Sequence, residues 1–229
     1  MKSILSLALL VGLGLSATAV EAWDNNNTPP QPSSCGNSTF PASGQTAPAT
    51  GTMTHTGATV RDDGFVKAGG ALSYRDNGDG TITDLNTGLM WEKKSADGSD
   101  HDVGKTFVWS SALTDTVWDW INAINTEVGN GIGFAGFNDW RLPNVRELLS
   151  IIDYGRLNPA VDPAFNNNFS FGCTVLTCSL SAQLAWSSTT VATVDIDAWT
   201  VDFAAGHVVA ALKSESHSVR AVRGGCVMP

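Results

Sequence analysis

The chain has 229 residues and a formal net charge of −9 at pH 7, because 13 Lys and Arg stand against 22 Asp and Glu. Its hydrophobic fraction of 42%, which includes 8 Trp and 9 Phe, is too high for a disordered chain. Nucleic acids and anionic membranes repel an acidic protein, so we expect neither as a partner. One globular domain with an appendage fits this length.

Residues 1–22 have the pattern of a cleaved secretory signal peptide. Lys2 supplies the positive start, residues 4–15 are apolar but too short to span a bilayer, and Val20 and Ala22 are small residues at a cleavage site. The alternative is a retained membrane anchor. We expect cleavage after Ala22 and export to the periplasm, the outer surface or the medium, without membrane insertion of the mature chain.

Residues 23–60 are rich in Asn, Pro, Ser, Thr and Gly and have almost no apolar periodicity. Such a segment cannot bury enough surface to order itself alone, so we predict an arm that precedes a domain over residues 61–229. An arm can dock onto a neighbouring copy of the chain, so a homo-oligomer is an alternative to a monomer.

Export makes the 4 cysteines candidates for disulfides, and four cysteines allow three pairings. Cys173 and Cys178 are close in sequence and would staple a local loop. Cys35 and Cys226 would then clamp the start of the mature chain to its end. A Cys-x-x-Cys spacing is absent, which disfavours zinc.

Residues 72–83 predict two short strands around a tight turn at 76–80, because the Asn-Gly and Asp-Gly steps accept positive φ. The same turn is partly similar to an EF-hand calcium loop. Arg75 and Asn86 stand where that loop needs its first carboxylate and its bidentate glutamate. We therefore expect no metal or other cofactor, with calcium as the alternative.

Two helices are expected next. Apolar residues recur with a period near 3.6 over residues 109–124 and again over 145–152. Asn144 has the position of an N-cap, with Glu147 at N3 of the second helix. The GxGxxG pattern at 131–136 follows a helix instead of a strand, so we reject a dinucleotide site there.

The remaining chain is loop-rich after residue 153 and then alternates apolar and polar residues. This alternation predicts strands at 184–188, 198–203, 207–212 and 218–223. A hairpin, two helices, long loops and a run of antiparallel strands form an α+β order instead of a βαβ series.

Five motifs occur in the order that marks one bacterial family: Asp-Asn-Gly-Asp-Gly-Thr-Ile-Thr-Asp at 76–84, Thr-Gly-Leu-Met-Trp at 87–91, Asp-Trp-Arg-Leu-Pro-Asn at 139–144 with Glu-Leu at 147–148, Trp-Ser-Ser-Thr at 186–189, and Val-Arg-Ala-Val-Arg-Gly-Gly at 219–225. They resemble the domain named after the C-terminal domain of the Legionella collagen-like protein. The resemblance runs from residue 40 to residue 226 and implies a C-type lectin-like fold over residues 61–229.

The namesake of that family is a surface adhesin that binds sulfated glycosaminoglycans. A net charge of −9 disfavours such a ligand for this chain, unless arginines make a local basic patch. The candidates for that patch are Arg146, Arg156, Arg220 and Arg223.

Three residues are candidate ligand contacts. Asn138 and Asp139 are similar to the Asn and Asp with which calcium-dependent lectins hold sugar and metal, and Trp118 lies off the apolar stripe of its helix. Alternatively, Asp139 pairs with an arginine and has a structural role. We assign structural roles to Arg141, Asn144, Glu147, Arg220 and Arg223, with the arginines bridging loops through Asp139, Asp153 or Glu147.

The sequence gives little indication of a catalytic constellation. The four histidines lack metal-ligand spacing, and no Gly-x-Ser-x-Gly elbow occurs outside the signal peptide. We expect an exported, non-enzymatic, adhesin-like module that recognises a glycan or a surface protein through its loops. The alternatives are an enzyme of the formylglycine-generating type, which the resemblance suggests through Arg-Leu-Pro, and a structural surface or assembly subunit.

The predicted disulfides, Cys173–Cys178 and Cys35–Cys226, are testable by peptide mapping of the exported chain without reduction. We expect one short-range and one long-range linked peptide. A main species that joins Cys35 to Cys173 or to Cys178 would contradict this pairing.

Overall fold

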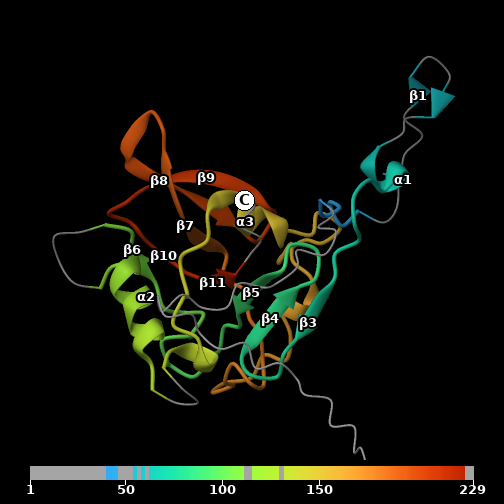
Figure 1. Cartoon of the computed structure of the whole chain (residues 1–229). Helices are drawn as coiled ribbons and strands as arrows, with labels where there is room; N and C mark the ends of the chain where they lie inside the picture. Colours follow the sequence, from blue (N-terminus) through green and yellow to red (C-terminus); the bar gives the residue numbers. More distant parts are fainter. Residues whose placement is uncertain are drawn as a thin grey trace, which may run out of the picture. The chain divides into compact units, whose positions relative to one another are not determined.

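The computed structural model describes residues 40–45, 54–55, 58–59, 62–110, 115–128 and 132–224 (Figure 1). All of these residues belong to one compact unit, 32–229. The predicted signal peptide, the first part of the arm and the predicted Cys35–Cys226 bond lie outside the described residues.

The predicted hairpin forms one side of a four-stranded antiparallel sheet. Its strands are β3 (Tyr74–Asp76), β4 (Thr81–Asp84), β5 (Leu89–Glu92) and β11 (Val222–Gly224), in the order β11-β5-β4-β3. In the turn, the Asp76 carboxylate accepts from Lys93 and from the N–H of Gly78, while Asp79 accepts from Thr81. The Asp79 carboxylate, which stands at a ligand position of the calcium alternative, is thus engaged within the protein.

The second half of the chain supplies a three-stranded antiparallel sheet. It contains β7 (Leu184–Val191), β8 (Val194–Asp202) and β9 (His207–Leu212), in the order β7-β8-β9. Two short antiparallel pairs complete the described strands. One joins β6 (Phe107–Val108) to β10 (Ser216–His217), and the other joins β1 (Thr54–His55) to β2 (Ala58–Thr59).

Only the end of the strand predicted at 218–223 is present as a strand. β10 ends before it and pairs with β6, whereas β11 begins at Val222 and pairs with β5. A continuous strand was expected from the alternation of residues alone. The residues between β10 and β11 include Arg220 instead. Its side chain is buried and bonds to carbonyl groups of other segments.

The two main helices are α2 (Val117–Thr126) and α3 (Val145–Ser150), and short turns of helix occur at α1 (Asp63–Val66), η1 (Phe134–Gly136) and η2 (Pro163–Phe165). The prediction that the first helix begins at Trp109 is wrong. Trp109 follows β6 directly, and the helix begins only after Thr116, where Thr116 and Asp119 form a capping box. Trp109 therefore has a helical spacing from the apolar residues of α2 without being part of the helix.

The core consists of two main clusters that the β7-β8 pair separates. Neighbouring strand residues point to opposite faces, so Ala185 and Val201 join the cluster under α3, while Trp186 and Ala198 join the cluster under α2. α3 packs against β7 and β8, and α2 packs against β6 and η1. Trp91 and Trp186 are both fully buried, one in each cluster.

Mixed helices and mainly antiparallel sheets confirm the α+β class. In the part of the chain that the structure describes, no helix has the length and apolar character needed to cross a membrane.

The start of α3 has the predicted cap. Asn144 accepts from the N–H groups of Arg146 and Glu147, and the Glu147 carboxylate accepts from the N–H of Asn144 at 2.8 Å. The cap therefore satisfies three N–H groups that the helix itself leaves unbonded.

Replacing Asn144 with Ala removes the acceptor for two of these N–H groups. We expect the free energy of unfolding to fall by about 1 kcal/mol, the usual effect of losing an N-cap. Urea unfolding of the variant and the parent would measure the difference. Asn144→Asp is the matched control, since it keeps the acceptor, and equal stability of Asn144→Ala and the parent would contradict the role of the cap.

Candidate functional site

Asp139 is held by an arginine instead of facing a ligand. The Arg223 guanidinium donates to both of its carboxylate oxygens, at 2.6 and 3.2 Å. The Arg223 side chain also lies over the Phe137 ring at 3.7 Å. Asn138 is exposed beside this pair. Both carboxylate oxygens are engaged, so the structural interpretation of Asp139 describes the geometry better than a metal ligand does.

A second pair fixes the Arg-Leu-Pro segment. Arg141 donates to both oxygens of Glu147, at 2.8 and 2.6 Å, so the residue at N3 of α3 caps the helix and holds the loop before it. The backbone of Arg141 exchanges two hydrogen bonds with Val222. The loop motif and the last motif of the sequence are therefore joined by side chains and by backbone.

A buried ionic cluster, which sequence reasoning missed, lies behind these loops. We define it as Glu92, Lys94, His101 and Arg220. Glu92 accepts from Lys94 Nζ at 3.0 Å, bonds His101 Nδ1 at 2.8 Å and accepts from the N–H of Ala221 at 2.8 Å. Burial alone would raise the pKa of Glu92, but attraction to Lys94 and His101 holds the pKa below its usual value. This carboxylate is therefore charged in the core.

Arg220 does not make the predicted bridge to Asp139, Asp153 or Glu147. Its guanidinium donates instead to the backbone carbonyl groups of Glu92 and Leu180. Burial lowers the pKa of Arg220 to about 10, and the charge of Glu92 opposes that shift. Those three carboxylates are each bonded by another arginine, namely Arg223, Arg156 and Arg141. Arg220 is buried and bonds to backbone carbonyl groups instead.

His101 connects the ionic cluster to the surface. Its Nε2 lies 3.1 Å from the Glu127 carboxylate, which is half exposed after the end of α2. Its ring lies 4.0 Å from the ring of Phe134 in η1. Burial by itself would lower the pKa of His101, but the hydrogen bond and charge of Glu92, together with the bond to Glu127, raise the pKa above its usual value.

Trp118 is the aromatic residue among the three candidate ligand contacts, and it is partly accessible to a ligand. It is the second residue of α2, its side chain is 43% exposed, and its ring meets the Trp109 ring edge-on with centroids 5.0 Å apart. Trp109 is fixed in turn by its indole N–H, which donates to the Ser187 carbonyl at 2.8 Å, and Lys213 Nζ lies 4.1 Å from its ring. We call Trp109, Trp118 and Lys213 the indole platform.

The structure does not bring the three predicted contact residues together. Trp118 is near the start of α2, whereas Asn125, near its end, holds the backbone of Trp140 beside Asp139 with two hydrogen bonds. Seven residues of helix separate these points by about 10 Å. Trp118 and the backbone beside Asp139 therefore lie about two helical turns apart along α2.

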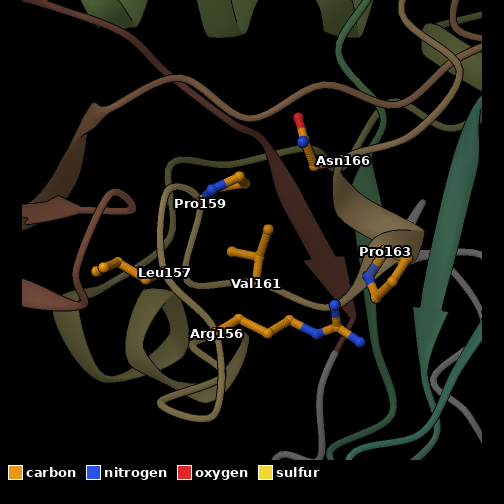
Figure 2. Close-up of a pocket in the computed structure, with 6 residues that line it drawn as sticks. All are labelled: Arg156, Leu157, Pro159, Val161, Pro163 and Asn166. Atoms are coloured by element: carbon orange, nitrogen blue, oxygen red, sulfur yellow. The ribbon is translucent and has the colours of Figure 1, made fainter.

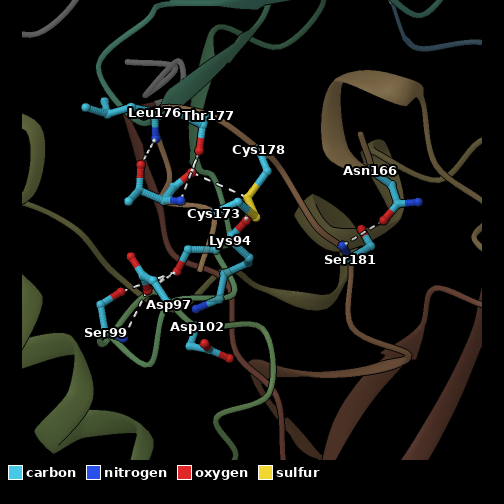
Figure 3. Close-up of a disulfide and its surroundings, with 12 residues drawn as sticks. Lys94, Asp97, Ser99, Asp102, Asn166, Cys173, Leu176, Thr177, Cys178 and Ser181 are labelled. Carbon is cyan, nitrogen blue, oxygen red and sulfur yellow. Dashed lines mark hydrogen bonds between the residues drawn. A yellow bond between two sulfur atoms is a disulfide. The ribbon is translucent and has the colours of Figure 1, made fainter. Parts of the chain in front are cut away.

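The disulfide predicted between Cys173 and Cys178 is present, with the Cα atoms 5.9 Å apart (Figure 3). Cys173 and Cys178 pack with Leu180 against Ala96 and Val103 in a small third cluster. The disulfide therefore fixes a loop onto the segment that follows β5.

A shallow hollow of 330 Å³ lies between the loop after α3 and η2 (Figure 2). Figure 2 shows one charged side chain in its lining, Arg156, which also pairs with Asp153 at 2.9 Å. The other lining residues are Leu157, Pro159, Val161, Pro163 and Asn166. None of the lining residues is an acid or a nucleophile, so this lining suits contact with a partner better than chemistry.

Among the residues that the structure describes, no group of three or more His, Cys, Asp or Glu side chains is placed to hold a metal ion.

The raised pKa of His101 predicts a pH dependence of stability. The folded state favours the protonated imidazole, so this stabilisation is complete below the unfolded pKa of about 6.5 and is lost as pH rises through the higher folded value. We therefore expect the free energy of unfolding to decline as pH rises above about 6.5, and His101→Gln to flatten that decline.

Urea unfolding over this pH range measures the effect. The matched control is His207→Gln, because His207 is exposed at the start of β9. If the parent and His101→Gln had the same pH profile, the proposed effect of His101 would be contradicted.

The family of the chain follows from comparison with known sequences. The model of the family described as the Lcl C-terminal domain matches residues 80–223. This match contains the hairpin from Gly80 on, both main helices, the stapled loop and the strands up to Arg223. The comparison with curated proteins finds no match. The matched residues cover more than half of the chain, which confirms the resemblance in the sequence, and the chain belongs to the Lcl C-terminal domain family.

Proposed function

We propose that the chain is an exported, non-enzymatic binding module of C-type lectin-like architecture, adhesin-like in its role, which recognises a glycan or a surface protein. The observation that carries the proposal is the indole platform. A half-exposed tryptophan that is braced by a second, fixed tryptophan is ready to stack before any ligand arrives.

The arrangement of elements supports the C-type lectin-like part of the proposal. Two helices, antiparallel strands and long connecting loops lie between strands that meet each other, since β11 pairs with β5. Such closure leaves the loops anchored at both ends. Anchored loops suit recognition because little conformational entropy is lost when a ligand binds them.

The charges around the indole platform favour a ligand without dense negative charge. Lys213 is the cation of the platform, but its ammonium group already donates to the Asp195 carbonyl at 2.7 Å. Asp115 and Asp119 flank Trp118 along the chain. A neutral sugar ring that stacks on the indole suits this surface better than a sulfated chain does.

The two rival functions predict different features. A formylglycine-generating type of enzyme needs a reactive cysteine, and the two cysteines in the described part of the chain are bonded to each other. Cys226 lies outside the described residues, so the peptide map above also tests this rival. An assembly subunit would use its arm and show no small-ligand binding.

A glycan array tests the proposal with the exported chain, first with calcium and then with chelator. We expect binding to neutral glycans that chelator leaves intact, because the carboxylates examined above are engaged within the protein. Trp118→Ala should weaken binding about tenfold or more, as the loss of a central aromatic contact does.

Phe40→Ala is the matched control, since Phe40 is an exposed aromatic side chain outside the indole platform. It should leave glycan binding unchanged. Equal binding by Trp118→Ala and the parent would remove the indole platform from the proposal, and an array without any bound glycan would favour the assembly subunit.

A further inference from the structure

The last strand of the three-stranded sheet, β9, has an open edge in the part of the chain that the structure describes. β9 pairs with β8 along one side, in a register that runs without a shift over all six residues (Figure 1). Its side chains Val208, Val209 and Leu212 are 40%, 41% and 43% exposed. The strand contains no Asp, Glu, Lys, Arg or Pro. It therefore lacks the charges, prolines and bulges that usually protect an edge strand from pairing.

The other edges of the two larger sheets are covered or short. On the outer side of β7, the N–H of Trp186 donates to the Ser218 carbonyl and the N–H of Ser188 donates to the Pro143 carbonyl. Arg141 exchanges two backbone hydrogen bonds with β11. β3 has three residues, of which two are charged. Among these described edges, β9 is therefore the exception.

The outward backbone groups of β9 belong to Val208 and Ala210. The Thr200 hydroxyl of β8 donates to the Val209 carbonyl at 2.9 Å, so the backbone polar groups of Val209 face β8. Successive residues of an antiparallel strand direct these groups to opposite sides, so those of Val208 and Ala210 face away from the sheet. Within the described ranges, no residue bonds to these outward groups.

Carboxylates flank both ends of this edge. Asp202 lies directly opposite the first residue of β9, and Asp197 lies directly opposite the last. Glu215 is exposed in the turn that follows the strand. Lys213, the nearest cation in the sequence, already donates to a backbone carbonyl and lies over an indole ring. A second copy would bring the same carboxylates and a net charge of −9, so the charges favour a basic partner.

We propose that the open edge of β9 binds an extended, basic peptide segment of another protein, which joins the sheet as a fourth strand. An extended peptide presents N–H and C=O groups at the spacing of an edge strand, so it can satisfy the outward groups of both Val208 and Ala210. Basic side chains near its ends would meet Asp197 and Asp202. This inference goes beyond the glycan proposal, because recognition is by backbone pairing instead of by the indole platform.

Hydrogen exchange, measured by NMR on the isotope-labelled exported chain, tests whether the edge is open. We expect the amides of Val208 and Ala210 to exchange at least about tenfold faster than those of Val209 and Ala211, which face β8. Protection of the two outward amides in the dilute chain would mean that another segment of the same chain covers the edge. Protection that grows with protein concentration would mean that a second copy does. Either result would overturn the proposal.

The nature of the partner is tested with a synthetic peptide, Lys-Thr-Val-Thr-Val-Thr-Lys with blocked ends, at millimolar concentration. We expect it to protect the amides of Val208 and Ala210 at least about fivefold. A peptide with glutamate in place of both lysines should bind about tenfold more weakly at low salt, because it meets like charges. The lysine peptide with its five central N–H groups methylated should not bind, since it cannot pair as a strand.

Ala210→Pro tests the same pairing from the side of the protein. Proline removes one outward N–H group and is tolerated where an edge strand faces solvent, so the domain should fold while peptide binding weakens about tenfold. Ala210→Thr is the matched control, because it keeps the N–H group, and it should bind like the parent. An unchanged amide spectrum away from β9 confirms that both variants are folded.

Three results would each reject the peptide as the partner of β9. These are a parent chain that does not bind the lysine peptide, equal binding of the lysine and glutamate peptides, and binding that survives either peptide methylation or Ala210→Pro. Glycan binding, which the array tests through Trp118, does not depend on these results, because none of the peptides or variants changes the indole platform.

Discussion

The Glu92 carboxylate is fully buried and is held by Lys94, His101 and the backbone N–H of Ala221. Removing one partner from such a buried group costs about 3–5 kcal/mol, because an uncompensated charge remains inside the protein. The partners come from two segments, the loop after β5 and the approach to β11. The position of this one charge therefore sets where the loop after β5, the approach to β11 and, through His101, the end of α2 must lie.

The arginine pairs at the surface continue the same arrangement outward. Arg220 and Arg223 are separated by two residues, and they hold the inner and the outer end of the segment that leads into β11. Arg141 and Glu147 fix the loop before α3 against that strand. In a chain with few charged residues, these charges are concentrated where distant segments must be joined.

Local patterns predicted the local structure well. The hairpin turn, the cap at Asn144 and the Cys173–Cys178 bond depend on residues a few positions apart, and each is present. The family was also recognisable from the sequence, because its five motifs occur in the order that is typical of the family. The predicted start of the first helix was wrong because the helical spacing of apolar residues extends by chance to Trp109. This residue belongs to the chain after β6.

The ionic cluster was beyond sequence reasoning because its members are far apart in the chain and none has a diagnostic spacing. Glu92 meets Ala221 across 129 residues, and Lys94 is an ordinary residue of a charged run. One signal was available: a carboxylate that directly follows the buried Trp91 in a strand needs a partner inside.

The pairing of β11 with β5 constrains the order of events while the chain is made. A ribosome releases the hairpin β3-β4-β5 long before Val222 exists, so the first sheet waits with one edge unpaired and Glu92 without its backbone donor. Contacts that span such long separations form slowly, because a large loop must close first. The first sheet of this chain is therefore completed only after its last strand has been made.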